Sequence, residues 1–168
     1  MPNRLVIGRG NVFADLLVVG EAPGLEEDKV GKPFIGRSGK LLSDLFIKSG
    51  INEDRDVYFC NVLKCRPPNN RKPSKKEMII HTPWVIQQIK VVNPRIVLLT
   101  GTTAMIAILN VKEPISKVRG KWIKKGGIYY FTIFHPSYLM RFSRDESKNA
   151  YGLTLKDLLN VKSKLYNL

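Results

Sequence analysis

The sequence predicts a three-layer α/β/α sandwich around a mostly parallel central sheet, folded as a single domain over residues 1–168. Apolar, strand-like runs alternate with helix-like segments along the chain, and this alternation is typical of α/β folds. The runs LLVVG, VYFCNV and RIVLLT are almost wholly apolar, as expected of parallel strands that are buried on both faces. A chain of 168 residues is long enough to bury a core, and no repeat or low-complexity tract divides it.

The first half of the chain contains two of these strands and a helix between them. A strand is predicted over residues 16–20, where a glycine ends the apolar run. Ser38 is expected to cap the following helix and Gly50 to end it. The apolar residues of this helix recur on one face: Leu41, Leu42, Leu45 and Phe46. A second strand is predicted over residues 57–62, and the proline-rich loop KCRPPNNRKP follows it.

The second half repeats the alternation of strands and helices. Ser74 is expected to begin a helix that runs towards Val92 and is kinked or interrupted at Pro83. A third strand is predicted over residues 95–100, and Gly101 opens the helix after it.

The last predicted strand belongs to a basic hairpin. The segment SKVRGKWIKKGGIYYFTIF is expected to bend at Gly126 and Gly127, and the strand that leaves the bend stops at His135. The segment YGLTLKDLLNVKSKL is then expected to form the closing helix.

This topology predicts the place of a binding site before any function is considered. In open α/β sheets, ligands bind beyond the carboxyl ends of the strands. The loops that follow the four strands should therefore line one site. They carry four polar candidates: Glu21, Asn61, Lys64 and His135.

The charge of the chain points to a polyanionic partner. Lys and Arg total 28 against 14 for Asp and Glu, which gives a formal net charge of +14. Such a charge attracts nucleic acids and speeds their association. A solvated surface in a lysine-biased proteome is the alternative explanation. No apolar run is long enough to span a membrane and no secretory signal opens the chain, so a cytoplasmic protein without a membrane partner is expected.

The loop GEAPGLEEDKVGKPFIGRSG, residues 20–39, is both glycine-rich and acidic. Gly31-Lys32 is followed by Pro33 and Gly39-Lys40 by Leu41, neither by serine or threonine, and the GxGxxG spacing is missing, so no nucleotide cofactor is expected. Glycines after a strand let a ligand approach the backbone, and a nearby carboxylate can position a water molecule. Phe34 can offer its ring to a planar base or pack in the core.

Three motifs in order resemble those of the family 4 uracil-DNA glycosylases. GEAPGLEEDKVGKPFIGRSGKLL resembles the first motif of the family and HPSYLMR the second, with NVLKCRPPNNRKP between them. The resemblance extends from about Asn11 to the final helix. It implies a uracil-DNA glycosylase-like domain that flips uracil out of DNA and hydrolyses its N-glycosidic bond, which leaves an abasic site for base excision repair.

The resemblance also implies how uracil is held. His135 matches the histidine that donates a hydrogen bond to uracil O2, where negative charge develops as the base leaves. Asn61 matches the asparagine that reads the O4/N3 edge of uracil, and Phe34 matches the ring that stacks on it. Gly20 and Ala22 are expected to complete this surface.

Glu21 and Glu27 are the candidate catalytic carboxylates. Several relatives carry an Asp that activates the water two positions after the glycine, and Ala22 occupies that position here. Glu21 is therefore expected to help place the water. Glu27 is expected near the water or near uracil C5, where bulk excludes thymine; a surface position is the alternative for both carboxylates.

The DNA contacts implied by the resemblance come from the second motif and the proline-rich loop. Leu139 matches the apolar wedge that fills the space of the flipped base, and Tyr138 and Met140 can widen it. Contacts to the DNA strand are expected from further polar residues: Arg141, Arg144, Lys64, Arg66, Asn70 and Arg71.

The sequence departs from the family in its cysteines. Family 4 enzymes resemble one another in holding a 4Fe–4S cluster on four cysteines, the first two in a CxxC that this sequence lacks. Cys65 matches the third ligand, and His81 stands in place of the fourth. No metal or cluster is therefore expected, although ligation by His81 together with cysteines outside this sequence stays open.

The expected partner is uracil-containing DNA, single- or double-stranded, bound by a monomer. Three alternatives stay open: a glycosylase for hypoxanthine or xanthine, a non-catalytic DNA-binding module like those of some phage polymerases, and a basic RNA-associated domain. A relative that bonds covalently to DNA through a loop histidine is disfavoured, because KCRPPNNRKPSKK contains none. No motif indicates a repair partner.

Overall fold

A computed structural model describes residues 4–142 and 149–168. Its centre is a six-stranded sheet in the order β1-β3-β2-β4-β6-β5. The four inner strands are parallel: β2 (Leu16–Gly20), β3 (Val57–Asn61), β4 (Ile96–Thr100) and β6 (Ile128–Ile133). The two edge strands, β1 (Arg9–Gly10) and β5 (Trp122–Lys125), are antiparallel to their neighbours. The predicted three-layer α/β/α fold is confirmed.

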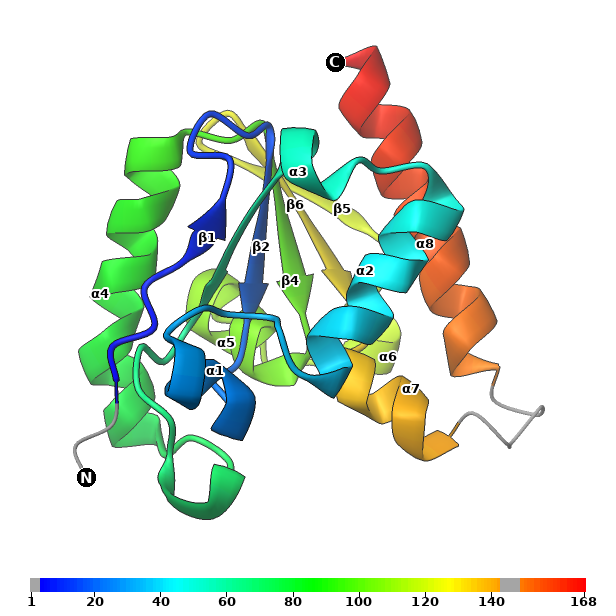
Figure 1. Ribbon diagram of the computed structural model, residues 1–168. Helices are drawn as coiled ribbons and strands as arrows, with labels where there is room; N and C mark the ends of the chain where they lie inside the picture. The colour runs from blue at the N-terminus through cyan, green and yellow to red at the C-terminus, as the bar shows by residue number, and fades with distance from the viewer. Residues whose placement is uncertain (1–3, 143–148) are drawn as a thin grey trace.

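The inner strands form the core because their side chains alternate between two apolar layers. Leu16 and Val18 pack into one layer with α2 (Arg37–Ser49) and α8 (Ala150–Asn167). Leu17 and Val19 pack into the other with α4 (Lys75–Val92) and α5 (Thr102–Leu109). Figure 1 shows α4 on one side of the sheet and the pair α2 and α8 on the other. All five residues of β2 and of β4 are buried, which explains their unbroken apolar sequence.

Two of the predicted helix ends are confirmed by their caps. Ser74 Oγ accepts a hydrogen bond from the Glu77 N–H while the Glu77 carboxylate accepts one from Ser74, which forms a capping box at the start of α4. Gly50 ends α2 in the left-handed conformation, with φ of 80°.

Three of the expected element boundaries are wrong. The N-cap of α2 is Gly36, so Ser38 lies inside the helix. Helix α4 continues through Pro83 to Val92 without interruption, and Pro83 lies at an exposed position. The last inner strand ends at Ile133 rather than His135, and α7 begins at Pro136.

The short elements were not predicted, because they carry too few residues to show a period. They are the helices α1 (Leu25–Val30), α3 (Glu53–Asp56), α6 (Ile115–Val118) and α7 (Pro136–Phe142), the 3₁₀ turn η1 (Pro68–Asn70), and strand β1. Helices α1 and α7 and the turn η1 gather at the edge of the sheet to which the arrowheads of β2 and β4 point in Figure 1. No helix in the described part of the chain is long and apolar enough to cross a membrane.

Candidate active site

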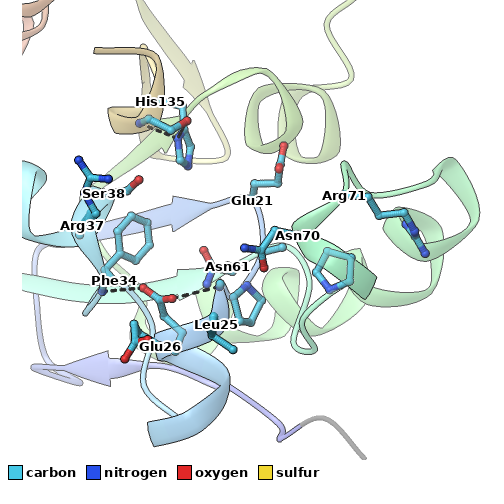
Figure 2. Close-up of a pocket in the computed structure, with 18 of the residues that line it drawn as sticks. Glu21, Leu25, Glu26, Phe34, Arg37, Ser38, Asn61, Asn70, Arg71 and His135 are labelled. Atoms are coloured by element: carbon cyan, nitrogen blue, oxygen red, sulfur yellow. Dashed lines mark hydrogen bonds between the residues drawn. The ribbon is translucent and has the colours of Figure 1, made fainter. Parts of the chain in front are cut away.

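A cleft of about 450 Å³ opens at the carboxyl ends of the parallel strands, where the topology predicts a ligand. Figure 2 shows Glu21, Phe34, Asn61 and His135 around this hollow. Of the candidate residues, nine line the cleft: Glu21, Ala22, Glu27, Phe34, Asn61, Asn70, Arg71, His135 and Arg141. A groove of about 340 Å³ adjoins it at Glu21 and His135 and continues along Lys72, Thr103 and Tyr138.

His135 enters the cleft in a defined tautomer. The backbone N–H of Ser137 donates to His135 Nδ1 at 3.1 Å, and Ser137 Oγ lies 2.7 Å from the same nitrogen. A backbone N–H can only donate, so Nδ1 accepts and the ring proton resides on Nε2. Burial is the main cause that lowers the pKa of His135, and the charge of Arg141 lowers it further against the opposing effect of Glu21. The ring is therefore a neutral hydrogen-bond donor.

Gly101 allows the imidazole to lie against the backbone at the end of β4. A methyl group at Gly101 would lie 2.9 Å from His135 Cβ and 3.3 Å from Cδ2, and the φ of Gly101 is +93°. Both observations require glycine at this position. The strand end thus sets the position of His135 from one side and α7 sets it from the other.

Asn61 presents a free carboxamide at the end of β3. The residue is only 4% exposed, yet its side-chain amide has no hydrogen-bond partner within residues 4–142 and 149–168. Its backbone is fixed instead, because the buried Lys64 ammonium donates to the Asn61 carbonyl at 2.7 Å. The polar atoms of its side chain are not among the fully buried atoms that lack a partner, so water or a ligand in the cleft can satisfy them. The carboxamide is therefore available for a polar edge in the cleft.

Phe34 and Asn61 converge on Gly20. A methyl group at Gly20 would collide with Asn61 Oδ1 and with the Phe34 ring, so the absence of a side chain lets these two groups meet above the strand end. Phe34 is 8% exposed and has φ of +57°. That conformation costs a bulky residue on the order of 1–3 kcal/mol and is kept only where the surroundings impose it.

Glu21 is held at the junction of the cleft and the groove. Thr103 Oγ1, on the first turn of α5, donates a hydrogen bond to Glu21 Oε2. Glu21 and His135 line both hollows. A carboxylate in this position can accept a proton from a water molecule in the cleft.

Glu27 also lines the cleft, but its carboxylate is bound to the backbone. Its Oε1 accepts hydrogen bonds from the Ile35 and Gly36 N–H groups at 3.2 and 2.8 Å, and its Oε2 accepts one from Gly24 at 3.1 Å. These three backbone donors favour a structural role for the carboxylate over activation of water. Glu27 fixes the backbone between Phe34 and α2.

These contacts predict opposite effects for two carboxylate changes. Glu21→Gln is expected to lower the single-turnover rate by about 10²-fold or more, the contribution typical of a general base, with little change in thermal stability. Glu27→Gln is expected to lower the free energy of unfolding by about 1–3 kcal/mol, because one acceptor oxygen becomes an NH2 group that faces a backbone N–H. Its single-turnover rate should fall less than that of Glu21→Gln. Thermal unfolding and single-turnover kinetics measure both effects; the reverse order of rates would contradict this assignment.

Two expected DNA contacts are wrong because their side chains are buried. Leu139 is 1% exposed and packs in the core layer with α2 and α8, so it cannot enter a duplex in this conformation. Lys64 is 4% exposed, and its ammonium also donates to Gln88 Oε1 at 2.5 Å. Burial lowers the pKa of Lys64. It supports Asn61 from beneath rather than contacting DNA.

The other expected DNA contacts lie near the cleft or its rim. Arg141 is exposed on the last turn of α7, and Tyr138 and Met140 are half-buried on the same helix. Arg71 is exposed, but both of its terminal nitrogens face Glu77, each at 2.8 Å. Arg66 donates to Asn70 at 2.6 Å, on the outer side of the proline-rich loop. Arg144 lies outside the described residues.

The sequence reasoning missed three residues of the site. Ser137 sets the tautomer of His135, and the HPS tripeptide is the signal that could have indicated it. Thr103 holds Glu21 from the helix after β4, which no motif indicates. Arg37 begins α2 at the exposed rim of the cleft, within the GRSG segment.

The donors for an iron–sulfur cluster are incomplete in the described part of the chain. No group of three or more His, Cys, Asp or Glu residues there could hold a metal ion. Cys65 is half-buried, and the Nδ1 atom of His81 accepts the neighbouring Lys64 N–H at 3.1 Å. Burial raises the pKa of Cys60 to about 11, so that this residue stays a thiol. These residues do not fit a cluster that needs four thiolates.

Comparisons with known proteins show the family of the chain. Residues 7–159 match the model of the uracil DNA glycosylase superfamily. The type-4 uracil-DNA glycosylase of Thermotoga maritima is 42% identical over 163 residues, which are 95% of this chain and 82% of that protein. The enzyme of the same name from Archaeoglobus fulgidus is 38% identical over 145 residues, 80% of this chain and 71% of that protein.

A third relative is a much larger protein, of which only a part matches this chain. The DNA polymerase of Bacillus phage SP01 is 31% identical over 134 residues, which are 80% of this chain but 14% of the polymerase. The family model covers nearly the whole chain, and nine of the candidate residues line one cleft. The chain is therefore a member of the uracil DNA glycosylase superfamily.

Proposed function

We propose that this protein is a DNA repair glycosylase that hydrolyses the N-glycosidic bond of uracil in DNA. The observation that carries the proposal is the convergence of a neutral histidine donor and an unpartnered carboxamide on one cleft. The glycosidic bond of a base stacked in a duplex is out of reach of the cleft, so the nucleotide must be flipped into it. The relationship to the type-4 enzymes supports the same reaction.

Each group in the cleft has a part in this reaction. The Phe34 ring stacks on uracil, and the Asn61 amide donates to O4 and accepts from N3–H, a pattern that cytosine reverses. As the bond between C1′ and N1 breaks, its electron pair moves onto uracil, and His135 Nε2–H stabilises the charge on O2. Water attacks C1′ and gives its proton to Glu21. Gly20 and Ala22 form the wall beside the ring.

DNA is held by the basic rim of the cleft and the groove. Arg37 and Arg141 are exposed at the cleft, and Lys72 lines the adjoining groove. With a net charge of +14, the affinity for DNA should fall steeply with salt. Since Leu139 is buried, the side chains of α7 that can press into the DNA are Tyr138 and Met140.

Base release from oligonucleotides tests the proposal. Single- and double-stranded oligonucleotides that carry uracil, hypoxanthine, xanthine or thymine are incubated with the protein, and abasic sites are cleaved with alkali. Cleavage at uracil and not at thymine is expected. Cleavage at hypoxanthine or xanthine alone would indicate the glycosylase for other deaminated bases. Binding without cleavage would indicate a non-catalytic module, the alternative that the phage polymerase relative favours.

The state of His135 predicts the pH dependence of the reaction. Because its pKa is lowered, the ring stays neutral and the single-turnover rate should hold as the pH falls through about 6.5, the ordinary value for histidine. The unfolded chain takes up the proton first, so this histidine makes the folded state less stable as the pH falls below about 6.5. Rates and thermal unfolding between about pH 5 and 8 measure both effects. A rate that halves near 6.5 would contradict the lowered pKa.

We also propose that the protein works as a cytoplasmic monomer without an iron–sulfur cluster. Two unpaired cysteines suit a reducing compartment, and the incomplete donor set at Cys65 and His81 supports the absence of a cluster. Iron analysis and visible absorption of the purified protein should show no iron–sulfur chromophore, and light scattering should give the mass of one chain. A stoichiometric chromophore would contradict the first statement and a dimer mass the second.

A further inference from the structure

Arg9 lies outside every motif of the sequence, yet its side chain forms hydrogen bonds with the backbone around Phe34. Its Nε donates to the Pro33 carbonyl at 2.6 Å and its Nη2 donates to the Phe34 carbonyl at 2.9 Å. Its Nη1 forms an ion pair with Glu53 at 2.8 Å, and both side chains are largely buried, with exposures of 22% and 23%. We propose that Arg9 is a positioning residue that holds Phe34 ready to stack on uracil, an inference that rests on the function proposed above.

The fold places Arg9 for this task. Strand β1 pairs Arg9 with Phe59 of β3, and the guanidinium lies over the Phe59 ring at 4.1 Å. The Phe34 ring packs against the same Phe59 with a centroid distance of 5.2 Å. Ser43 Oγ donates to the second oxygen of Glu53 at 2.6 Å and so fixes the carboxylate that anchors Arg9. Arginine suits this site because the N–H groups of its planar guanidinium can donate to two carbonyls and a carboxylate at once.

The contacts of Arg9 act on a strained residue. Phe34 has φ of +57°, which a bulky side chain adopts only under constraint. Arg9 holds the carbonyl groups of Pro33 and Phe34, while Glu27 holds the amide groups of Ile35 and Gly36. The turn is thus clamped on both sides. Without the guanidinium, two carbonyls lose their donor and the turn can relax to a negative φ, which moves the ring away from Gly20 and Asn61.

This role predicts an effect on uracil binding rather than on bond cleavage. Within the described residues, no hydrogen bond or ion pair joins Arg9 to His135, Asn61 or Glu21, so the chemical step should stay intact once the base is bound. Arg9→Gln should therefore raise the inhibition constant of free uracil by about tenfold, within the range that loss of one base–aromatic stack costs. The single-turnover rate at saturating DNA should change less than threefold, a small effect on the chemical step.

Arg95→Gln is the matched control. Arg95 also donates to a backbone carbonyl, that of Leu165 at 3.4 Å, and forms an ion pair with Asp15 at 2.8 Å, but at the amino ends of the strands, away from the cleft. Both variants lose bonds of the same kind, so both should lower the unfolding temperature. Only Arg9→Gln should weaken inhibition by uracil. Arg9→Lys, which keeps the charge beside Glu53 but not the fork, should give an intermediate inhibition constant and provides a folded variant if Arg9→Gln does not fold.

A double-mutant cycle with Phe34 decides the inference. In the Phe34→Ala background, Arg9→Gln should leave the inhibition constant unchanged, because the ring through which Arg9 acts is gone. If wild-type protein releases uracil but Arg9→Gln matches Arg95→Gln, or acts equally in both backgrounds, Arg9 is merely structural and the inference is overturned. If wild-type protein releases no uracil, the proposed function fails and the inference falls with it.

Discussion

Changing Asn61 to aspartate is expected to slow uracil release by about 10⁴-fold, the scale of discrimination that a site built on paired hydrogen bonds achieves. A carboxylate offers no N–H to uracil O4 and places a negative charge against its lone pairs. Asn61 is 4% exposed, so solvent does not screen this repulsion. Lys64 fixes the backbone of Asn61, so the side chain has little freedom to withdraw.

The same substitution at the rim of the cleft is the control. Asn70 lines the same cleft but is exposed, and its Oδ1 already accepts a hydrogen bond from Arg66, which an aspartate can keep. Asn70→Asp should therefore change the rate of uracil release less than about tenfold, as is usual for an exposed polar change. Single-turnover assays on one uracil oligonucleotide compare the two variants. Equal rates would show that Asn61 does not read the base.

His135→Ala is expected to lower the single-turnover rate by about 10²–10³-fold, the usual cost of removing one donor that faces a developing oxyanion. The loss should appear in the chemical step, because Phe34 and Asn61 still hold the base. The affinity for uracil-containing DNA should therefore change little. Measurement of the rate at saturating enzyme, together with DNA binding, separates the two quantities.

Ser137→Ala provides the control for the histidine. The variant loses the hydroxyl contact to Nδ1, but the Ser137 backbone N–H still donates to that nitrogen. The neutral tautomer is kept, so the rate should fall less than about tenfold, in line with the loss of one neutral hydrogen bond. A loss in Ser137→Ala as large as in His135→Ala would mean that the hydroxyl, rather than the backbone, sets the state of the ring.

The inner strands and the main helices could be predicted because their patterns are long. Three apolar runs and the caps at Ser74 and Gly50 placed them correctly. The position of the site also followed, because the carboxyl ends of parallel strands meet at one edge and carry Glu21, Asn61 and His135. Strand β1 could not be predicted, because a strand of two residues is too short to show an alternating apolar pattern. The role of Arg9 was missed for the same reason.

The roles of individual side chains were harder to predict than their places. The motifs pointed to Glu27, Lys64 and Leu139, of which Glu27 lines the cleft, but burial and hydrogen bonding decide what each can do. Three backbone amides occupy Glu27, a carbonyl and an amide occupy Lys64, and the core encloses Leu139. These are properties of the packed chain that no single sequence displays. The conformation of Phe34 is a further property of the packed chain, because the hydrogen bonds from Arg9 and Glu27 stabilise its positive φ.

A crystal structure of the protein with free uracil tests the central claim most directly. The ring should lie against Phe34, with O2 within about 2.7–3.2 Å of His135 Nε2 and the opposite edge within the same distance of the Asn61 carboxamide. Uracil bound elsewhere, or held by only one of these two side chains, would contradict the proposal that a neutral imidazole and a carboxamide grip one flipped base.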